Sequence, residues 1–251
     1  MRRVRFTDPA GSVRTGEWTA AGIEAAGAVY DPAAVDVLPP VDPTKVLGIH
    51  QNWQGRFDDP ADFPAQPRMW LKGGPNVVAG HGDTIPIPDT GAVRFEAELA
   101  VVIGEQCRWV TPDEANGVIA GYTCLNDISD GSQDNEFRTK SFDHSAPIGP
   151  VLAGPDRVPN QPRIRLWQNG DRRVDVTDDA FIYTPPELVA AYSQHVTLEP
   201  GDVIGTGNPG GSKMLADGDT IEIEIEGIGR LEHDVVVRSA PSAGDRDPST
   251  R

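Results

Sequence analysis

The sequence is poor in cysteine and has no long apolar run, and each absence excludes a class of protein. Cys107 and Cys124 are its two cysteines, too few for a disulfide framework and without the spacing of a zinc site. We expect both to be buried as small hydrophobic side chains. No apolar run approaches the ~20 residues that a membrane helix needs, and the amino terminus lacks the apolar stretch of a signal peptide. We therefore expect a cytoplasmic protein.

Positive charge is also scarce. Lys and Arg together number 22 against 38 Asp and Glu, which gives a net charge of -16. Such a field repels the phosphates of nucleic acids and the surfaces of anionic membranes, so we expect neither as a partner. The charge is equally consistent with a simple role in solubility. An acidic substrate would need a local cluster of basic residues.

Glycine and proline are abundant, and they divide the chain into short segments. The 27 Gly and 23 Pro interrupt it every few residues, and the segments between them alternate apolar and polar residues more often than they show a helical period. This pattern predicts an α+β fold that is mainly β. We expect strands at residues 3–6, 46–49, 95–103, 163–168 and 221–225. We expect helices at residues 20–26, 112–120 and 185–193.

The chain length suits one large domain with a small annex. Residues 1–40 predict a small N-terminal β domain, because a Pro-flanked linker follows them. We expect residues 45–238 to form the main domain. Residues 241–251 contain Pro, Ser, Asp and Gly without an apolar anchor, so we expect a disordered tail.

The segment at residues 94–104 is the most informative. Read as a strand, it places its odd-numbered apolar residues on one face and Glu96 and Glu98 together on the other. Two neighbouring carboxylates repel each other unless a cation or a shared proton lies between them. Oxygen ligands suit Mg, Ca or Mn better than zinc. The alternative is the exposed polar face of an edge strand.

A third carboxylate follows another strand-like run. Residues 121–125 lead into Asn126 and Asp127, at a point where a strand end can present a side chain to a cleft. An ordinary turn would explain the same two residues.

Residues 205–210 satisfy the G-x-G-x-x-G spacing of dinucleotide-binding folds. No helix can be read after them, since residues 211–219 are loop-like and residues 220–226 alternate as a strand. We therefore reject a dinucleotide fold and expect these glycines to form a turn that lines the metal cleft.

Taken in chain order, these segments resemble the fumarylacetoacetate hydrolase family. Residues 95–104 look like its Glu-x-Glu metal strand, and residues 121–129 look like its Gly-Tyr-Thr-x-x-Asn-Asp-x-Ser motif. Four more segments are similar to its Pro-x-x-Phe-x-Lys, Lys-Ser-Phe-Asp, Thr-Gly-Thr-Pro and closing Gly-Asp regions: residues 67–78, 140–150, 193–211 and 215–231. Together they cover roughly residues 45–235 and are highly specific as a set.

The resemblance implies a fold, a cofactor and a site. The fold is a mixed β-sandwich roll of the fumarylacetoacetate hydrolase type, and the assembly is a homodimer. The cofactor is Mg²⁺, or Mn²⁺, with Ca²⁺ possible, held by Glu96, Glu98 and Asp127. The substrate is a small 2-oxo acid or β-diketo acid. Lys140 supplies a positive charge for a substrate carboxylate or a developing oxyanion, unless it is a solvated surface lysine, and Lys72 falls on the lysine of the Pro-x-x-Phe-x-Lys segment as a substrate-binding residue.

The chain departs from the family at several positions. In the family, a Gly-x-Asn-Tyr-x-x-His-x-x-Glu segment supplies a His and Glu dyad that activates water. In this chain, Gln54 and Phe57 stand at the dyad positions unless the register slips. His50 stands at the family's Asn, either as a substrate-binding residue or as a packed histidine. The Arg expected two residues after Ser129 is absent. Three more residues are candidates for substrate binding. Gln51 and Gln54 could bind a ligand without proton transfer, and Asn208 replaces a Thr of the Thr-Gly-Thr-Pro segment.

Three functional hypotheses remain open. The first is a metal-dependent enzyme that stabilises an enolate of a 2-oxo or β-keto acid, with hydrolysis of a carbon–carbon bond as the family default. The second is a decarboxylase, tautomerase or isomerase that needs no activated water. In either, His144 is the nearest candidate for a replacement base, and a structural role is its alternative. The third is a metal-retaining binding protein without turnover.

Overall fold

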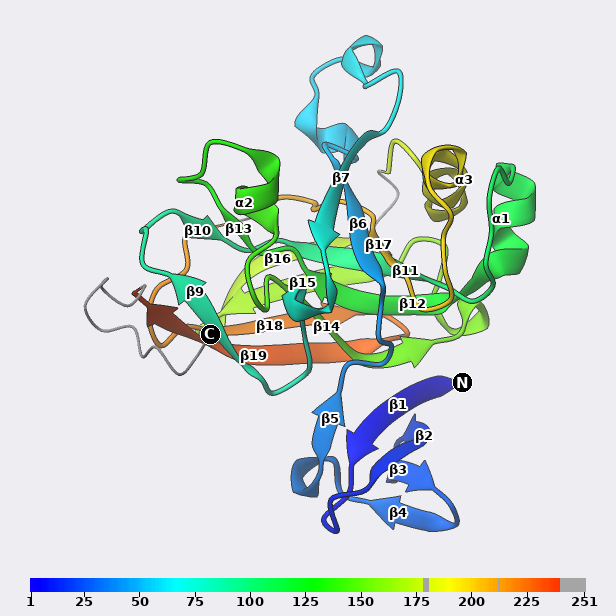
Figure 1. Ribbon diagram of the computed structural model, residues 1–251, viewed down its shortest axis with the longest axis vertical. Coiled ribbons are helices and arrows are strands. Elements are labelled where there is room, and N and C mark those ends of the chain that lie inside the picture. The colour runs from blue at the N-terminus through cyan, green and yellow to red at the C-terminus, as the bar shows by residue number, and fades with distance from the viewer. Residues whose placement is uncertain (178–180, 212, 240–251) are drawn as a thin grey trace, which may run out of the picture.

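A computed structural model describes residues 1–177, 181–211 and 213–239 (Figure 1). The predicted disordered tail at residues 241–251 lies outside this part of the chain. The mainly-β prediction is confirmed, because strands from the whole length build two mixed sheets and the helices are few. Within the described residues, no helix is both long and apolar enough to span a bilayer.

The N-terminal strands form a lobe below the main body in Figure 1. They are β1 (Arg2–Thr7), β2 (Val13–Thr19), β3 (Gly22–Ala25), β4 (Ala28–Tyr30) and β5 (Asp36–Leu38). The strand predicted at residues 3–6 is confirmed. The start of β1 also pairs with β14 of the main body, so the lobe continues the large sheet. The domain boundary near residue 40 stays a prediction.

The helix predicted at residues 20–26 is wrong, because this segment contains β3. Gly22 and Gly27 have positive φ angles of 128° and 81°, which suit turns and not a helix. Between them Ile23 and Ala25 are buried while Glu24 is exposed, the alternation of a strand. The pairing of β3 with β2 and β4 outweighs the helical tendency of its alanines.

The main body contains the rest of the large sheet. Its strands are β6 (Lys45–His50), β7 (Arg68–Gly73), β8 (Val78–Ala79), β11 (Ala97–Ile103), β12 (Ile119–Asn126), β14 (Ala146–Ala153) and β17 (Val203–Gly205). The order β14-β12-β11-β17-β6-β7 puts β11 in the interior, with β12 on one side and β17 on the other. The alternative of an exposed edge strand at residues 95–103 is therefore wrong.

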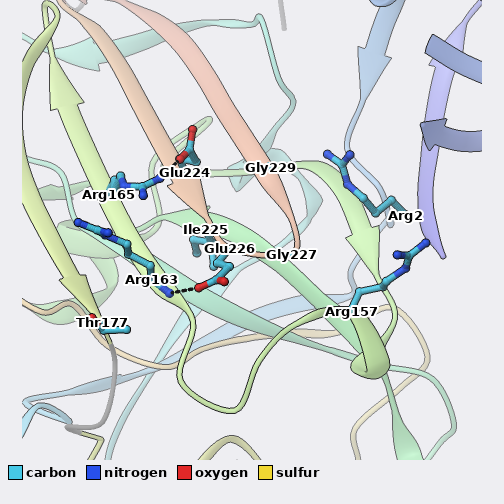
Figure 2. Close-up of a pocket in the computed structure, with 10 residues that line it drawn as sticks. All are labelled: Arg2, Arg157, Arg163, Arg165, Thr177, Glu224, Ile225, Glu226, Gly227 and Gly229. Carbon is cyan, nitrogen blue, oxygen red and sulfur yellow. Dashed lines mark hydrogen bonds and ion pairs between the residues drawn. The ribbon is translucent and has the colours of Figure 1, made fainter. Parts of the chain in front are cut away.

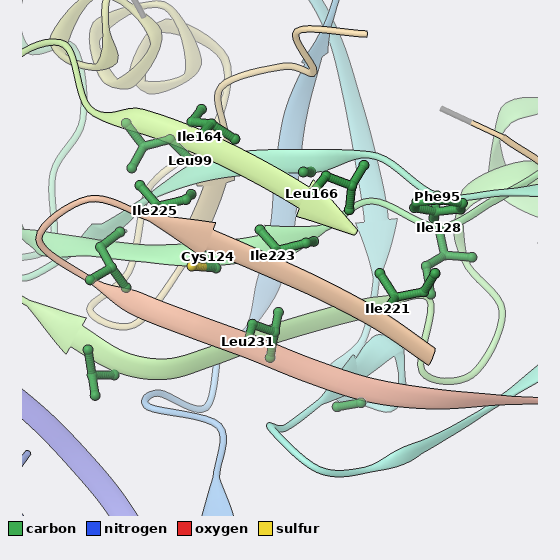
Figure 3. Close-up of a cluster of buried hydrophobic side chains, with 14 of the residues drawn as sticks. Phe95, Leu99, Cys124, Ile128, Ile164, Leu166, Ile221, Ile223, Ile225 and Leu231 are labelled. Atoms are coloured by element: carbon green, nitrogen blue, oxygen red, sulfur yellow. The ribbon is translucent and has the colours of Figure 1, made fainter. Parts of the chain in front are cut away.

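A second sheet packs against the large one. It contains β9 (Thr84–Pro88), β15 (Arg163–Gln168), β16 (Asp171–Thr177), β18 (Thr220–Ile225) and β19 (Gly229–Arg238), and a separate two-stranded ribbon joins β10 (Val93–Arg94) to β13 (Ser129–Asp130). Figure 3 shows the apolar side chains of the two sheets meeting between β11, β12 and β14 and β15, β18 and β19. Cys124 lies in this core and Cys107 is buried elsewhere, as predicted. Burial of this layer fixes the strands that carry the site.

Two of the three predicted helices are confirmed. They are α1 (Pro112–Val118) and α3 (Pro185–His195), and both begin with a capping box and a proline in the first turn. Their apolar residues pack against β6, β11 and β17. A third helix, α2 (Glu136–Lys140), was not predicted, because one short turn capped by Asn135 leaves almost no periodic signal.

Candidate metal centre

Glu96, Glu98 and Asp127 meet where two neighbouring strands end. Glu98 lies on β11, Glu96 directly precedes this strand, and Asp127 directly follows its antiparallel partner β12. The Asp127 amide donates a hydrogen bond of 2.9 Å to the Glu96 carbonyl, which places the two residues side by side. One carboxylate oxygen from each residue lies within 4.8 Å of the others. The sequence therefore identified a real acidic cluster.

The cluster is buried at a considerable electrostatic cost. Glu98 is 1 % exposed and Asp127 is 0 % exposed. Desolvation raises the pKa of Glu98 well above its ordinary value, and the charges of Asp127 and Glu96 raise it further. Desolvation and the Asp127 charge also raise the pKa of Glu96. Three acidic groups in so little space need positive charge to remain ionised.

Two buried lysines supply part of that charge at Asp127. Lys140 forms an ion pair and hydrogen bond with Asp127 Oδ2, and Lys72 Nζ lies 3.0 Å from Asp127 Oδ1. Desolvation alone would raise the pKa of Asp127, but the two ammonium groups outweigh it and hold the pKa below its ordinary value. Burial lowers the pKa of Lys72 to about 8 against the opposing effect of Asp127.

Lys72 has little capacity left for a substrate. It is 0 % exposed, and its ammonium group donates to the carbonyls of Ile128 at 2.7 Å and Lys140 at 2.9 Å besides facing Asp127. The two carbonyls use two of its three donors, and the Asp127 carboxylate lies beside the ammonium group. The geometry therefore favours a positioning role for Lys72, which holds Asp127 and the end of α2 in place. It does not favour the predicted role in substrate binding.

The donor set fits a hard divalent cation. Asp127 Oδ1 is buried and accepts no hydrogen bond, although Lys72 Nζ lies 3.0 Å away. Such an unfilled buried acceptor is costly unless a cation uses it. Three carboxylates and no sulfur or imidazole ligand match Mg²⁺ or Mn²⁺. The residues present thus fit the ion that the family resemblance implies.

The glycine-rich segment after β17 lies beside the acidic cluster. The sequence analysis had predicted that these glycines line the metal cleft and do not bind a dinucleotide. A Cβ on Gly205 would lie 2.3 Å from Glu98 Oε2, so only glycine leaves room for this carboxylate. The Gly207 amide donates to the same oxygen at 3.0 Å. Asn208 Nδ2 donates to Glu96 Oε1 at 3.0 Å. Asn208, predicted to bind substrate, therefore contacts a metal-ligand candidate and orients it.

The segment after β6 is attached to this loop by hydrogen bonds from two side chains, those of Asn52 and Trp53. Asn52 donates to the carbonyls of Thr206 at 2.8 Å and Tyr183 at 2.9 Å. Trp53 Nε1 donates to the Gly207 carbonyl at 2.9 Å. Both side chains are buried, and they place residues 52–56 against the metal loop.

These anchors favour a different alignment with the Asn-Tyr-x-x-His-x-x-Glu segment. When residues 52–53 stand for Asn-Tyr, the dyad positions fall on Arg56 and Asp59 in place of Gln54 and Phe57. Either register lacks the His and Glu. The shift adds one functional candidate, because the Arg56 charge acts on Glu96 and its guanidinium donates to the Asn208 carbonyl at 3.4 Å.

Four other predicted site residues contact parts of the protein other than Glu96, Glu98 and Asp127. His50 Nε2 pairs with Glu136 Oε1 at 2.9 Å, and the Gln51 side chain accepts from Arg68. Gln54 Nε2 donates to a main-chain carbonyl, that of Phe181, at 3.1 Å. His144 adopts a left-handed conformation with φ of 59°, and its amide donates to Asn76. Among the hydrogen bonds of the described residues, none joins these four to the acidic cluster.

Trp70 is another residue that the sequence analysis missed as a site residue. Its buried ring lies 4.5 Å from Lys140 Nζ, a cation–π distance. The His50 ring lies near the same ring, with centroids 6.5 Å apart and the two planes tilted by 54°. The tryptophan stands at the Phe of the Pro-x-x-Phe-x-Lys segment, which was the available signal.

A buried Asn and His support the cluster from behind. The Glu96 amide donates to Asn126 Oδ1 at 3.1 Å, which turns Asn126 Nδ2 toward His233 Nε2 at 2.9 Å. His233 Nε2 must then be the acceptor, so the ring is neutral. Desolvation lowers the pKa of His233 to about 3. Since His233 lies on β19 and 107 residues from Asn126, no local pattern could reveal the contact.

Because His233 is neutral in the folded protein, we expect acid to destabilise the fold. The folded-state pKa lies below the ordinary value of 6.5, so the contribution of His233 is fully present above pH 6.5 and is lost as the pH falls toward 3. This loss should lower the free energy of unfolding by on the order of 3 kcal/mol at pH ~4.5. Urea unfolding in chelator should therefore show a steeper loss of stability in acid for the wild type than for His233→Gln. Equal slopes would contradict a buried neutral His233.

The comparisons with known proteins agree with the geometry. The model of the family described as fumarylacetoacetate (FAA) hydrolase C-terminal matches residues 47–236. An oxaloacetate tautomerase from Bacillus subtilis is 34% identical over 192 residues, which are 70% of this chain and 63% of that protein.

Two solved structures share the fold along most of the chain. A 5-carboxymethyl-2-hydroxymuconate delta-isomerase from Mycobacterium smegmatis has a TM-score of 0.87 and 31% identity, covering 96% of this chain and 100% of that one. A maleylpyruvate hydrolase from Sphingobium sp. SYK-6, in complex with manganese(II) and pyruvate, has a TM-score of 0.80 and 27% identity, with coverages of 94% and 99%. These likenesses confirm the predicted fold type, and the chain belongs to the fumarylacetoacetate hydrolase C-terminal family.

Proposed function

We propose that this chain is a divalent-metal-dependent enzyme that acts on a 2-oxo acid or β-diketo acid by decarboxylation or enol–keto interconversion. One observation carries the choice of reaction. The acidic cluster and Lys140 are in place, whereas neither register of residues 50–59 supplies the His and Glu that would activate water. The predicted hydrolysis is thus the weaker reading of this site.

Each residue of the site has a distinct role in this proposal. Glu96, Glu98 and Asp127 would hold Mg²⁺ or Mn²⁺, which when bound polarises the vicinal oxygens of a 2-oxo acid as a Lewis acid. Asn208 and the Gly207 amide fix the two glutamates. Lys140 places an ammonium group beside Asp127, where it can stabilise negative charge that develops on an enolate oxygen.

Both reactions follow from enolate stabilisation. In decarboxylation of a 3-carboxylated 2-oxo acid, the bond to the departing carboxylate breaks, CO₂ leaves, and the electron pair forms an enolate that a proton then quenches at carbon. In tautomerisation, a proton moves between the enol oxygen and that carbon. Neither reaction consumes water, so neither needs the missing dyad.

The relatives support the reaction class without selecting one member. Their names include a tautomerase, an isomerase and a hydrolase. The manganese and pyruvate of the maleylpyruvate hydrolase complex support a metal and a 2-oxo acid for this chain as well. We also retain the homodimer and the cytoplasmic location as predictions.

Hydrolysis remains the second candidate because of one contact. His50 and Glu136 form a histidine–carboxylate pair at 2.9 Å, and α2 carries both Glu136 and Lys140. A half-exposed pair at this position could activate water after a closure of the segment around it. His50→Gln would remove such a base without touching the acidic cluster.

Parallel assays test the proposed reaction. We expect Mg²⁺-dependent loss of CO₂ or enol–keto interconversion with oxaloacetate, abolished by chelator, and only feeble cleavage of acetylpyruvate. General-base assistance is typically worth ~10²- to 10⁴-fold, so its absence should slow hydrolysis by a factor of this order. Efficient cleavage of acetylpyruvate that His50→Gln removes would establish hydrolysis instead. Metal-dependent binding without turnover of either acid would favour the binding-protein hypothesis.

A further inference from the structure

A pocket lies at the seam between the two layers that cover one face of the large sheet. On this face of β11, Leu99 packs in the core beneath the second sheet, whereas Val101 and Ile103 pack beneath α1 and α3. Tyr122, on the neighbouring strand β12, packs against both clusters. The pocket opens at this junction, with a volume of about 480 Å³ and with Leu99 and Tyr122 in its wall.

Four prolines form much of the remaining wall. Pro155 and Pro159 belong to the turn that follows β14, and Pro185 and Pro186 begin α3. A proline has a fixed φ angle and almost no side-chain freedom, so such a wall loses little conformational entropy when a ligand binds. The volume lies within the range of about 300–1,000 Å³ that is common for small-molecule sites. The pocket is therefore both large enough and rigid enough to hold a small molecule.

Among the described residues that line this pocket, none carries a charge. The polar ones are Asn116, Tyr122, Asn160, Gln161 and Thr184. An ionised ligand would lose its hydration there without gaining a counterion, which is unfavourable. The lining therefore suits a neutral molecule.

A larger pocket elsewhere provides the contrast. Figure 2 shows four arginines around it, together with Glu224 and Glu226. Arg165 points at Glu224 and forms an ion pair with it, and Arg163 pairs with Asp175 at 2.6 Å. These charges compensate one another within the protein, so we assign no ligand to the larger pocket.

The Tyr122 hydroxyl gives the uncharged pocket a polar group that the protein does not use. Among the hydrogen bonds of the described residues, none involves this hydroxyl, whereas those of Tyr183 and Tyr192 donate to the main-chain carbonyls of Pro64 and Trp70. Burial raises the pKa of the Tyr122 hydroxyl, which keeps it in the neutral form that can donate. A half-buried tyrosine hydroxyl normally has a partner, and a ligand in the pocket can supply one.

We propose that this pocket binds a small neutral aromatic molecule that carries a hydroxyl or carbonyl group, with the Tyr122 hydroxyl as its hydrogen-bond partner. The proline rings and the Tyr122 ring offer apolar surfaces against which an aromatic ring packs. The exposed amides of Asn160 and Gln161 leave the pocket open to solvent on a polar side. This ligand is not the substrate of the metal centre, and the proposal does not depend on the proposed function.

The pocket and the metal centre use opposite faces of β11. Leu99 directly follows Glu98, and side chains of a strand alternate between its faces. The Leu99 carbonyl accepts hydrogen bonds of 2.9 Å from the amide and from Oγ1 of Thr206, and the amide of the next residue, Gly207, donates to Glu98 at 3.0 Å. The strand thus separates the two sites, and their ligands should bind without competing.

Fluorine NMR with three ligands that share one ring tests the proposal. They are the neutral 4-fluorobenzyl alcohol, the anion 4-fluorobenzoate and the cation 4-fluorobenzylamine. We expect saturable binding of the alcohol, at least about tenfold tighter than that of either ion, because the lining offers no counterion. The cation separates this effect from the repulsion of anions by the net charge of -16.

Two variants locate the binding site. Tyr122→Phe should weaken binding of the alcohol by about two- to tenfold, because one neutral hydrogen bond is lost. Asn160→Trp should weaken it by at least about tenfold, because the larger side chain fills the pocket. Val13→Trp, at an exposed position of the N-terminal lobe, is the matched control and should bind as the wild type does. Saturating oxalate with Mg²⁺ should leave the affinity for the alcohol unchanged.

Several results would overturn the proposal. They are equal affinity for the alcohol and either ion, a Tyr122→Phe or Asn160→Trp variant that binds the alcohol as tightly as the wild type, displacement of the alcohol by oxalate, and absence of saturable binding. None of them bears on turnover at the metal centre, so the proposed function would stand. Asn160 is exposed and Tyr122→Phe keeps the ring, so both variants should fold, and their melting temperatures verify this.

Discussion

Replacing Glu98 with glutamine should weaken Mg²⁺ or Mn²⁺ binding by at least about 100-fold. Glutamine keeps the size of the side chain and can still accept from the Gly207 amide, which lies 3.0 Å from Glu98 Oε2. It removes one of three negative charges from a site within which the ligand atoms lie 4.8 Å or less apart. Loss of a charge at such range is worth several kcal/mol, and ~1.4 kcal/mol corresponds to tenfold in affinity.

Without metal, Glu98→Gln should not be less stable than the wild type. Because burial and the neighbouring carboxylates disfavour the charged form of Glu98, Glu98→Gln should melt at or above the wild-type temperature in chelator. Addition of Mg²⁺ should then raise the melting temperature of the wild type but not of the variant. Glu105→Gln, an exposed glutamate, is the matched control. Unchanged calorimetric affinity for Mg²⁺ in Glu98→Gln would refute the metal centre.

Replacing Lys140 with methionine should separate substrate binding from metal binding. With Mg²⁺ present, we expect the affinity for oxalate, a 2-oxo acid mimic, to fall roughly 10- to 100-fold, because a charge-assisted contact worth ~1.5–3 kcal/mol is lost. Affinity for Mg²⁺ itself should stay equal or rise, because Lys140 also pairs with Asp127 and opposes the ion there. Calorimetry of both ligands gives the two values.

A conservative variant and a stability measurement complete this prediction. Lys140→Arg should recover part of the oxalate affinity, since it keeps the charge. The metal-free methionine variant should be less stable than wild type, because Asp127 then depends on Lys72 alone for compensation. If oxalate binds the methionine variant as tightly as the wild type, Lys140 serves only as a buried counterion of Asp127.

The sequence by itself determined the parts of this protein that depend on local pattern. The alternation of residues 95–103 placed Glu96 and Glu98 on one side of an extended segment, because side chains of an extended chain alternate. In the structure β11 begins one residue after Glu96. The run at residues 121–127 placed Asp127 at a strand end for the same reason. The proline and capping residues at Thr111 and Thr184 marked two helices correctly.

Tertiary structure decided everything that depends on contacts between distant segments. Residues 20–26 became a strand because two neighbouring strands were available to pair with it. Lys72 became a buried counterion because β7 lies near the ends of β12 and α2, and the sequence alone could not show that its ammonium group would bind two carbonyls and face Asp127 there.

The same reason applies to the rim of the site. The register of the segment that carries Arg56 was set by buried hydrogen bonds from Asn52 and Trp53 to a loop more than a hundred residues away. His50 on β6 met Glu136 on α2, and Arg56, Arg94 and Lys213 came to line one pocket, only because the fold brings distant segments together. Ligand residues two apart on one strand can be read from the sequence, whereas a pocket built from three segments exists only in the folded chain.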